Sequence, residues 1–142
     1  MLSFVRTKTE HDLDELEAFC HWCIKKLRLS RYPIALRLRK RLSGQRLGVC
    51  TGEGTGVAIE LSLDQSRADL LDSLAHELVH ARQMKSGILH QIDGKLLYRG
   101  IPIGDLPPGM EEEELPYEKE ARKKAAKLVG DWLEEQDNGR II

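Results

Sequence analysis

Residues 66–87 of the chain are SRADLLDSLAHELVHARQMKSG, and this segment is the strongest indication of the fold. Ser66 is followed three residues later by Asp69, which approximates a capping box and predicts the start of a helix. Gly87 is typical of the residue just past a helix end, so the predicted helix stops there. We therefore predict one capped amphipathic helix whose apolar face contains Leu71, Leu74, Ala75 and Leu78.

The pattern His76-Glu77-Leu78-Val79-His80 lies in the middle of this predicted helix. Positions four apart lie on the same face of a helix, so His76 and His80 can direct ring nitrogens at one ion. Zinc in a catalytic site takes three protein ligands and a water, whose pKa falls toward about 7 so that a neighbouring carboxylate can remove its proton. The spacing therefore supplies two zinc ligands, His76 and His80, and a catalytic base, Glu77.

A third zinc ligand must come from elsewhere, and a predicted helix from about residue 116 to residue 135 offers two glutamates. Glu118 shares a face with the apolar positions of that helix, whereas Glu120 shares a face with lysines. A carboxylate on a buried face is costly unless something compensates it, and a divalent cation would do so. We therefore expect Glu118 to be the third ligand, with Glu120 and His90 as the alternatives.

The rest of the chain predicts a further helix, three strands and a hairpin. Apolar residues recur with helical spacing between about Glu10 and Leu27, which predicts the first helix. After Pro33, alternation along residues 34–39 predicts a strand with an apolar side and a solvated basic side. Residues 45–51 and 56–62 predict two more strands, so we expect a small antiparallel meander. Asp93-Gly94 predicts a hairpin turn between residues 90–92 and 95–98, followed by an irregular loop that contains Pro102, Pro107, Pro108 and Gly109.

This order of helix, strands, helix, hairpin and helix describes an α+β domain. The chain has 142 residues, which is the usual size of one domain, so we expect residues 1–142 to form a single unit. The N-terminus lacks the apolar stretch of a secretory signal, and no run approaches the roughly 20 apolar residues that span a bilayer. The three cysteines are an odd number, which favours a reducing compartment. We expect a cytoplasmic protein without a membrane partner.

Two other patterns have structural interpretations that compete with functional ones. Cys20 and Cys23 match the redox C-x-x-C spacing, but both lie on the apolar stripe of the first predicted helix, which favours packed cysteines. Nine basic and no acidic residues lie between Lys25 and Arg46, although the formal net charge of the chain is only -1. This basic segment is either a solvated face or a surface that attracts nucleic acid.

The motif His76-Glu-Leu-Val-His80, preceded by residues 70–75 (LLDSLA) and followed by Glu118-Lys-Glu-Ala121, resembles the gluzincin-type zinc metallopeptidases. The resemblance is to the compact SprT-like and phage-encoded zincins and the ImmA/IrrE group, over about residues 45–130. It implies a minimal zincin-like fold in which the C-terminal helix carries a glutamate ligand three residues before an alanine, which again selects Glu118. It also implies a strand just before the motif helix that runs antiparallel to bound peptide, a place that Gly56–Ser62 occupies.

We therefore expect a zinc-dependent peptidase that hydrolyses a protein or peptide substrate. The alternative is a zincin-like, zinc-binding regulatory or nucleic-acid-associated module without proteolytic turnover, in contact with nucleic acid through Lys25–Arg46. Some SprT-like proteases act on DNA-bound proteins, so the resemblance is compatible with such a contact. A purely structural zinc fits less well, because closed structural sites usually use four protein ligands and the sequence offers three.

Overall fold

The helix that carries the histidine motif has the ends that the sequence predicts. In the computed structural model, which describes residues 1–52, 55–92, 95–103 and 115–139, helix α2 spans Arg67–Ser86. The Ser66 hydroxyl accepts a hydrogen bond from the Asp69 backbone N–H at 3.1 Å, as expected of an N-cap. Gly87 closes the helix with a φ of 82°, a left-handed conformation that glycine adopts without strain.

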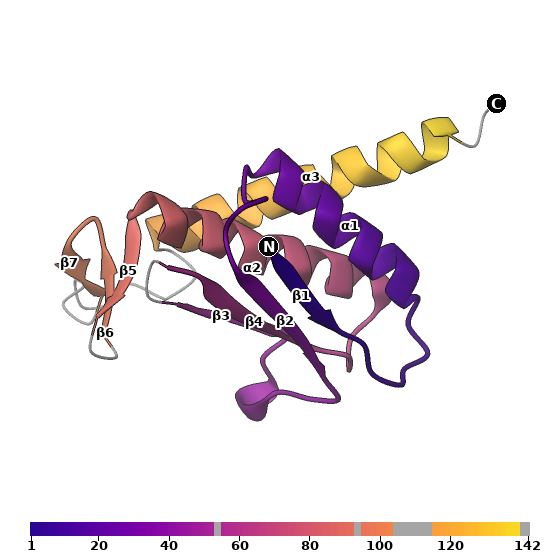
Figure 1. Ribbon diagram of the computed structural model, residues 1–142, viewed down its shortest axis with the longest axis horizontal. Coiled ribbons are helices and arrows are strands. Elements are labelled where there is room, and N and C mark those ends of the chain that lie inside the picture. Colours follow the sequence, from indigo (N-terminus) through magenta and orange to yellow (C-terminus); the bar gives the residue numbers. More distant parts are fainter. Residues whose placement is uncertain (53–54, 93–94, 104–114, 140–142) are drawn as a thin grey trace.

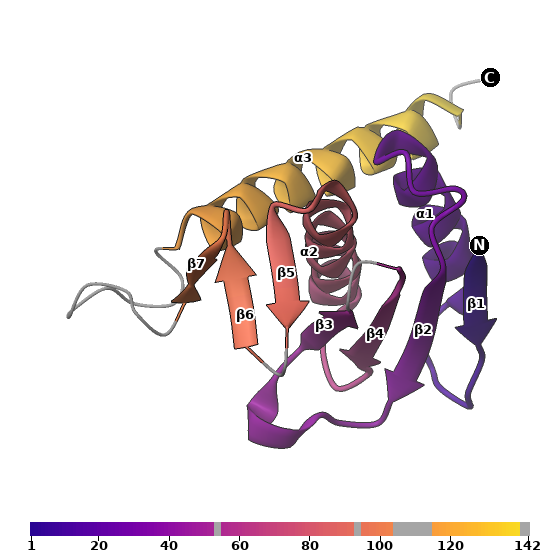
Figure 2. The ribbon, with the colours of Figure 1, turned by 60° about the vertical axis from the view of Figure 1, so that its left-hand side comes forward.

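Two more helices pack around α2. Helix α1 spans Leu13–Lys26 and begins after Asp12, whose carboxylate accepts a hydrogen bond from the Glu15 N–H at 3.0 Å. Helix α3 spans Pro116–Gly139, so it starts where the sequence predicts and continues past the expected end at residue 135. Helices α1 and α2 lie on one face of the main sheet, and α3 lies outside them (Figures 1 and 2).

An aromatic cluster fixes α3 on the outside of the helical layer. The Trp132 ring of α3 lies 5.6 Å from the Phe19 ring and 5.7 Å from the Trp22 ring, both on α1. Such ring pairs bury a large apolar area and add about 0.5–1.5 kcal/mol beyond it. This contact and the extensive packing of α3 on α2 set the position of the first turn of α3, which carries Glu118.

The main sheet is mixed, so the prediction of an antiparallel meander is wrong. Its order is β1-β2-β4-β3, with β1 at Leu2–Val5, β2 at Ile34–Arg39, β3 at Gly48–Gly52 and β4 at Val57–Ser62. Strand β2 pairs in parallel with both β1 and β4, and only β3 is antiparallel to its neighbour β4. The chain therefore begins with strand β1 and not with a helix. Helix α1 is the crossover that connects β1 to the parallel strand β2.

The strand order also corrects the expectation for residues 56–62. Strand β4 pairs with β2 along one edge and with β3 along the other, so neither edge is free to receive a peptide. Strand β3 pairs only with β4 among the described strands, and it is the outer strand at this side of the sheet. Of the two outer strands, β1 and β3, it is β3 that packs against the motif helix α2, so the outer strand beside the motif is one strand earlier in the sequence than expected.

The two faces of the sheet differ as the alternation along β2 predicts. Leu36 of β2 and Ile59 and Leu61 of β4 are buried against the helices. Arg37 and Arg39 are exposed on the opposite face, and the Arg39 Nε donates a hydrogen bond to Glu60 at 2.7 Å. The prediction of a solvated basic side is confirmed.

The basic segment Lys25–Arg46 is distributed over several elements. It extends from the last turn of α1 along β2 into a 3₁₀ turn at Ser43–Gln45. The C-terminal end of α1 and the loop after β2 lie at opposite ends of that strand (Figure 2). The nine basic residues therefore do not share one helix face or one strand face.

The predicted hairpin is present and is extended by a third short strand. Strand β5 at Leu89–Ile92 pairs antiparallel with β6 at Lys95–Tyr98, and β7 at Ile101–Pro102 adds to β6. The turn at Asp93-Gly94 and residues 107–109 of the expected loop lie outside the described residues. The helices and sheets confirm the α+β class, and no helix in the described parts of the chain has the length and hydropathy needed to cross a bilayer.

Candidate metal centre

Two histidines of α2 point at a common centre. His76 and His80 stand one helical turn apart, and their Nε2 atoms lie 3.1 Å from each other. The two rings meet edge to face, with centroids 4.7 Å apart. Helical spacing alone brings the two side chains together, as the sequence predicts.

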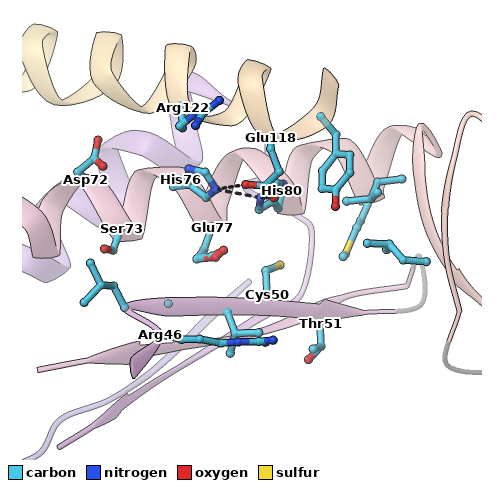
Figure 3. Close-up of a pocket in the computed structure, with 17 residues that line it drawn as sticks. Arg46, Cys50, Thr51, Asp72, Ser73, His76, Glu77, His80, Glu118 and Arg122 are labelled. Atoms are coloured by element: carbon cyan, nitrogen blue, oxygen red, sulfur yellow. Dashed lines mark hydrogen bonds and ion pairs between the residues drawn. The ribbon is translucent and has the colours of Figure 1, made fainter. Parts of the chain in front are cut away.

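Glu118 from α3 completes the group. Its Oε2 lies 3.2 Å from His76 Nε2 and its Oε1 lies 2.9 Å from His80 Nε2 (Figure 3). The donor atoms of these three residues all lie within 4.8 Å of one another, so the group could hold a metal ion. The structure therefore brings together the three residues that the sequence selects as ligands.

The two alternative ligands lie elsewhere. Glu120 is exposed, and its Oε1 accepts a hydrogen bond from Gln83 Nε2 at 3.1 Å and lies 3.7 Å from Lys124 Nζ. His90 is exposed on β5 beside Gly87. Among the described residues, neither belongs to the group formed by His76, His80 and Glu118.

The charges of the group are strongly coupled. Partial burial of Glu118 would by itself raise the pKa of its carboxyl, but hydrogen bonds from His76 and His80 lower that pKa to about 2. Burial of the His80 ring would lower its pKa, yet Glu118 and Glu77 together raise it above the ordinary value. The carboxylate therefore stays ionised at neutral pH and favours a positive charge next to it, as a cation site requires.

The geometry fits a divalent ion with nitrogen and oxygen ligands. In a tetrahedral zinc site, with ligand distances of about 2.0–2.1 Å, neighbouring ligand atoms lie about 3.3 Å apart. The two histidine Nε2 atoms lie 3.1 Å apart, close to that value. Glu118 approaches His80 with Oε1 at 2.9 Å and His76 with Oε2 at 3.2 Å, and one ligand atom from each of the three residues lies within 4.8 Å of the others. Three protein ligands would leave one coordination position facing the pocket.

Glu77 lies beside the group and points the other way, toward β3 (Figure 3). Its side chain is 6% exposed, and its Oε2 has no hydrogen-bond partner in the described part of the chain. Burial raises the pKa of this carboxyl, and His80, His76 and Arg46 partly offset the effect. A buried carboxylate oxygen without a hydrogen-bond partner is costly, and in Glu77 it borders the pocket next to the metal-binding group.

The group opens into a pocket of about 720 Å³ between β3, α2 and the start of α3. Asp72, His76, His80 and Met84 recur at intervals of four residues along the pocket-lining face of α2. The N-terminal part of this face is polar, with Asp72 and Ser73. The other end contains Met84 with Leu89 of β5 and Leu96 of β6, so the pocket is polar at one end and apolar at the other.

Two residues of the site were missed in the sequence. Gly48 of β3 lies close to Glu77, and a contact between two elements leaves no signal in the local pattern around residue 48. Gln83 is fully buried and its side chain bonds to His80. Its position three residues after His80 places it near the same helix face, and this spacing could have identified it.

Cys20 and Cys23 are packed in the core, as predicted. Both side chains are 0% exposed on the inner face of α1, and neither forms a disulfide. Burial raises the pKa of the Cys20 thiol to about 12 and also raises that of Cys23, so neither is a ready nucleophile. Neither thiol belongs to the metal-binding group.

No protein-family model matches this chain, and none of the curated proteins matches it either. The position and chemistry of His76, Glu77, His80 and Glu118 are therefore the basis on which a function is inferred.

Proposed function

We propose that this chain is a zinc-dependent metallopeptidase of the zincin type. The observation that carries the proposal is the buried Glu77 carboxylate, whose unpartnered oxygen lies next to three convergent ligands at the wall of an open pocket. Zinc is the metal that two imidazoles and one carboxylate in tetrahedral geometry favour. The motif that places Glu77 between the two histidines is typical of this class of enzyme.

Each residue has a distinct part in the proposed reaction. A zinc ion bound by the three groups would lower the pKa of a water molecule and polarise the scissile carbonyl. Glu77 removes the proton from the attacking water and later transfers it to the leaving amine. The raised pKa of Glu77 suits both transfers, because a base is most effective when its pKa approaches the working pH.

An extended polypeptide is the substrate that the pocket fits. Strand β3 forms one wall of the pocket with residues 48–51, and β4 occupies only one of its edges. A peptide that adds to the other edge gains backbone hydrogen bonds irrespective of its sequence. Such a peptide would lie between β3 and the metal group and bring a backbone carbonyl toward Glu77.

The open pocket favours an enzyme over a closed structural or regulatory metal site. A structural zinc usually has four protein ligands, whereas the described residues contribute three. A regulatory module has no use for a buried carboxylate that points toward the substrate wall. The orphaned Glu77 oxygen is therefore the specific feature that separates the two classes.

The experiment compares wild-type protein with Glu77→Gln, both loaded with one equivalent of zinc. The probe is denatured casein, and new N-termini are identified by mass spectrometry. We expect wild type to cleave the probe in a chelator-sensitive manner, and Glu77→Gln to keep its zinc but lose at least about a hundredfold in turnover. Glu134→Gln on the exposed part of α3 is the matched control and should retain full activity.

Cleavage that persists in Glu77→Gln would exclude Glu77 as the base. Stoichiometric zinc binding by a wild-type protein that cleaves neither casein nor a random peptide library would instead support the regulatory module.

A further inference from the structure

We propose that Gln83 is a positioning residue that fixes the tautomer of His80 and ties the Glu118 turn of α3 to α2. This inference rests on the proposed metal site and deepens it, because it assigns the group that orients two of the three ligands. Gln83 lies on α2, three residues after His80, and only 2% of its surface is exposed.

The Gln83 amide makes three hydrogen bonds that converge from two helices. His80 Nδ1 and Gln83 Oε1 lie 2.8 Å apart within α2. Gln83 Nε2 lies 3.0 Å from the backbone carbonyl oxygen of Tyr117 and 3.1 Å from Glu120 Oε1, both on α3. A buried polar side chain with such a network is held in one orientation.

The partners determine which end of the amide faces which helix. The Tyr117 carbonyl and the Glu120 carboxylate are both acceptors, so the group that faces them must be the Gln83 NH₂. The Gln83 oxygen then has to face His80 Nδ1. Turning the amide over would place its oxygen against two other acceptors and leave the NH₂ hydrogens without partners on α3.

This orientation sets the tautomer of His80. An amide oxygen can only accept, so His80 Nδ1 must carry the proton and donate it to Gln83. In a neutral imidazole, the form that binds a cation, the other nitrogen, Nε2, then presents its lone pair, whereas without a cation a second proton on Nε2 donates to Glu118. His80 Nε2 is the atom that faces His76 and Glu118, so Gln83 prepares it to ligate a cation.

The NH₂ end of the Gln83 amide restrains the backbone next to the third ligand, Glu118. Tyr117 directly precedes Glu118, and its carbonyl is held by Gln83 at the first turn of α3. The same side chain therefore restrains the ring of His80 and the backbone from which Glu118 extends. Glu118 is the one ligand that helical spacing on α2 cannot position, because it comes from another helix.

The first test measures zinc affinity by competition with a chromophoric chelator. Gln83→Met keeps the volume of the side chain and removes its hydrogen bonds, so we expect zinc affinity to fall about 10–100-fold. Gln136→Met makes the same replacement at an exposed position of α3 and should bind zinc as wild type does. Unchanged affinity in a folded Gln83→Met protein would overturn the proposal.

The second test identifies the ring nitrogen of His80 that carries the proton. Nitrogen-15 NMR of the zinc-loaded wild-type protein should show one slowly exchanging ring proton on His80, bound to Nδ1. Gln83→Glu retains an acceptor for this proton but no donor for Tyr117, so we expect it to keep the Nδ1 proton and still lose zinc affinity. A His80 ring protonated at Nε2 in wild type would disprove the tautomer assignment even if Gln83→Met fails to fold.

The two proposals fail in different ways. If wild-type protein binds no zinc, the metal site itself is wrong. If wild type binds zinc and cleaves casein, but His80 carries its ring proton on Nε2, the metallopeptidase proposal stands and the role of Gln83 is wrong.

Discussion

Gly48 lets strand β3 lie close to Glu77, because it has no Cβ atom on the side that faces this glutamate. A Cβ atom added at Gly48 would lie 3.1 Å from Glu77 Cγ and 3.1 Å from Leu61 Cδ2. These separations are shorter than ordinary carbon contacts, so a larger residue at position 48 has to displace one of the two side chains. Leu61 is completely buried, whereas Glu77 borders the pocket and has room to move.

We therefore expect Gly48→Ala to move Glu77 and leave the metal ligands in place. Turnover should fall by about tenfold to a hundredfold, because catalytic groups are sensitive to shifts of less than 1 Å. Zinc content should stay at the wild-type value, since the three atoms nearest the added methyl group belong to Glu77, Leu61 and Glu60 and to none of the ligands. Parallel measurements of kcat and bound zinc check this, and loss of zinc would show that the effect is not confined to Glu77.

Gly130 is a glycine whose replacement by alanine should stabilise the folded protein. It lies in the interior of α3 and is exposed, and a Cβ atom there meets no heavy atom within 4 Å. Alanine restricts the unfolded chain and favours the helix, so Gly130→Ala should raise the free energy of unfolding by about 0.5–1 kcal/mol. Urea denaturation measures the change, and a destabilised variant would contradict it.

The three proposed ligands can be separated from their neighbour Glu120 by metal analysis. We expect His76→Ala and Glu118→Ala to lose stoichiometric zinc, because each removes a donor from a group of three. Glu120→Ala should retain one zinc per chain, since Glu120 contacts Gln83 and Lys124 outside that group. Emission spectroscopy of dialysed protein gives the stoichiometry. Zinc loss in Glu120→Ala with retention in Glu118→Ala would reverse the assignment.

The buried thiol of Cys20 makes stability depend on alkaline pH. Burial raises its pKa from 9.0 to about 12, so between these values the folded state keeps a proton that the unfolded state has released. The unfolded state therefore binds fewer protons, and the free energy of unfolding falls as pH rises, by up to about 1.4 kcal/mol per pH unit. Stability is unaffected by this thiol below about pH 9.

Cys20→Ala should therefore show a shallower loss of stability between pH 9 and pH 11 than wild type. Denaturant titrations at each pH measure the slope, and the titrating groups that do not interact with Cys20 cancel in the comparison. Parallel slopes for the two proteins would show that Cys20 ionises as easily in the folded state as in the unfolded state.

The polarity of the pocket predicts which residues flank the cleaved bond. The chain segment that leads into β3 and α2 run along the pocket in the same direction. Figure 3 shows this in the order of Arg46, Cys50 and Thr51 on one wall and of Asp72, His76 and His80 on the other. A peptide antiparallel to β3 therefore has its N-terminal part at the end formed by Met84, Leu89 and Leu96.

We expect apolar residues on the N-terminal side of the cleaved bond, because that end of the pocket is lined by apolar side chains. Sequencing the products of a random peptide library measures this preference. Met84→Lys should shift the preference toward acidic residues by placing a positive charge in this part of the pocket. A library cleaved without regard to the residue on that side would contradict the orientation.

The sequence by itself determined the features that depend on local chemistry. Ser66 and Gly87 mark the ends of α2 because capping hydrogen bonds and a left-handed glycine involve residues only a few positions apart. The pairing of His76 with His80 follows from helical spacing, and the choice of Glu118 over Glu120 follows from which face of α3 is apolar. Each of these depends on periodicity within one element.

The tertiary structure alone decided how the elements meet. Strand β1 has only four residues, too few for alternation to stand out, and the pairing of β3 outside β4 depends on contacts that no single strand encodes. The contact of Gly48 with Glu77 and the bonds from Gln83 to α3 join residues far apart in the sequence. Local patterns report which face of an element is apolar, whereas the element it packs against is set by the combined burial of the whole chain.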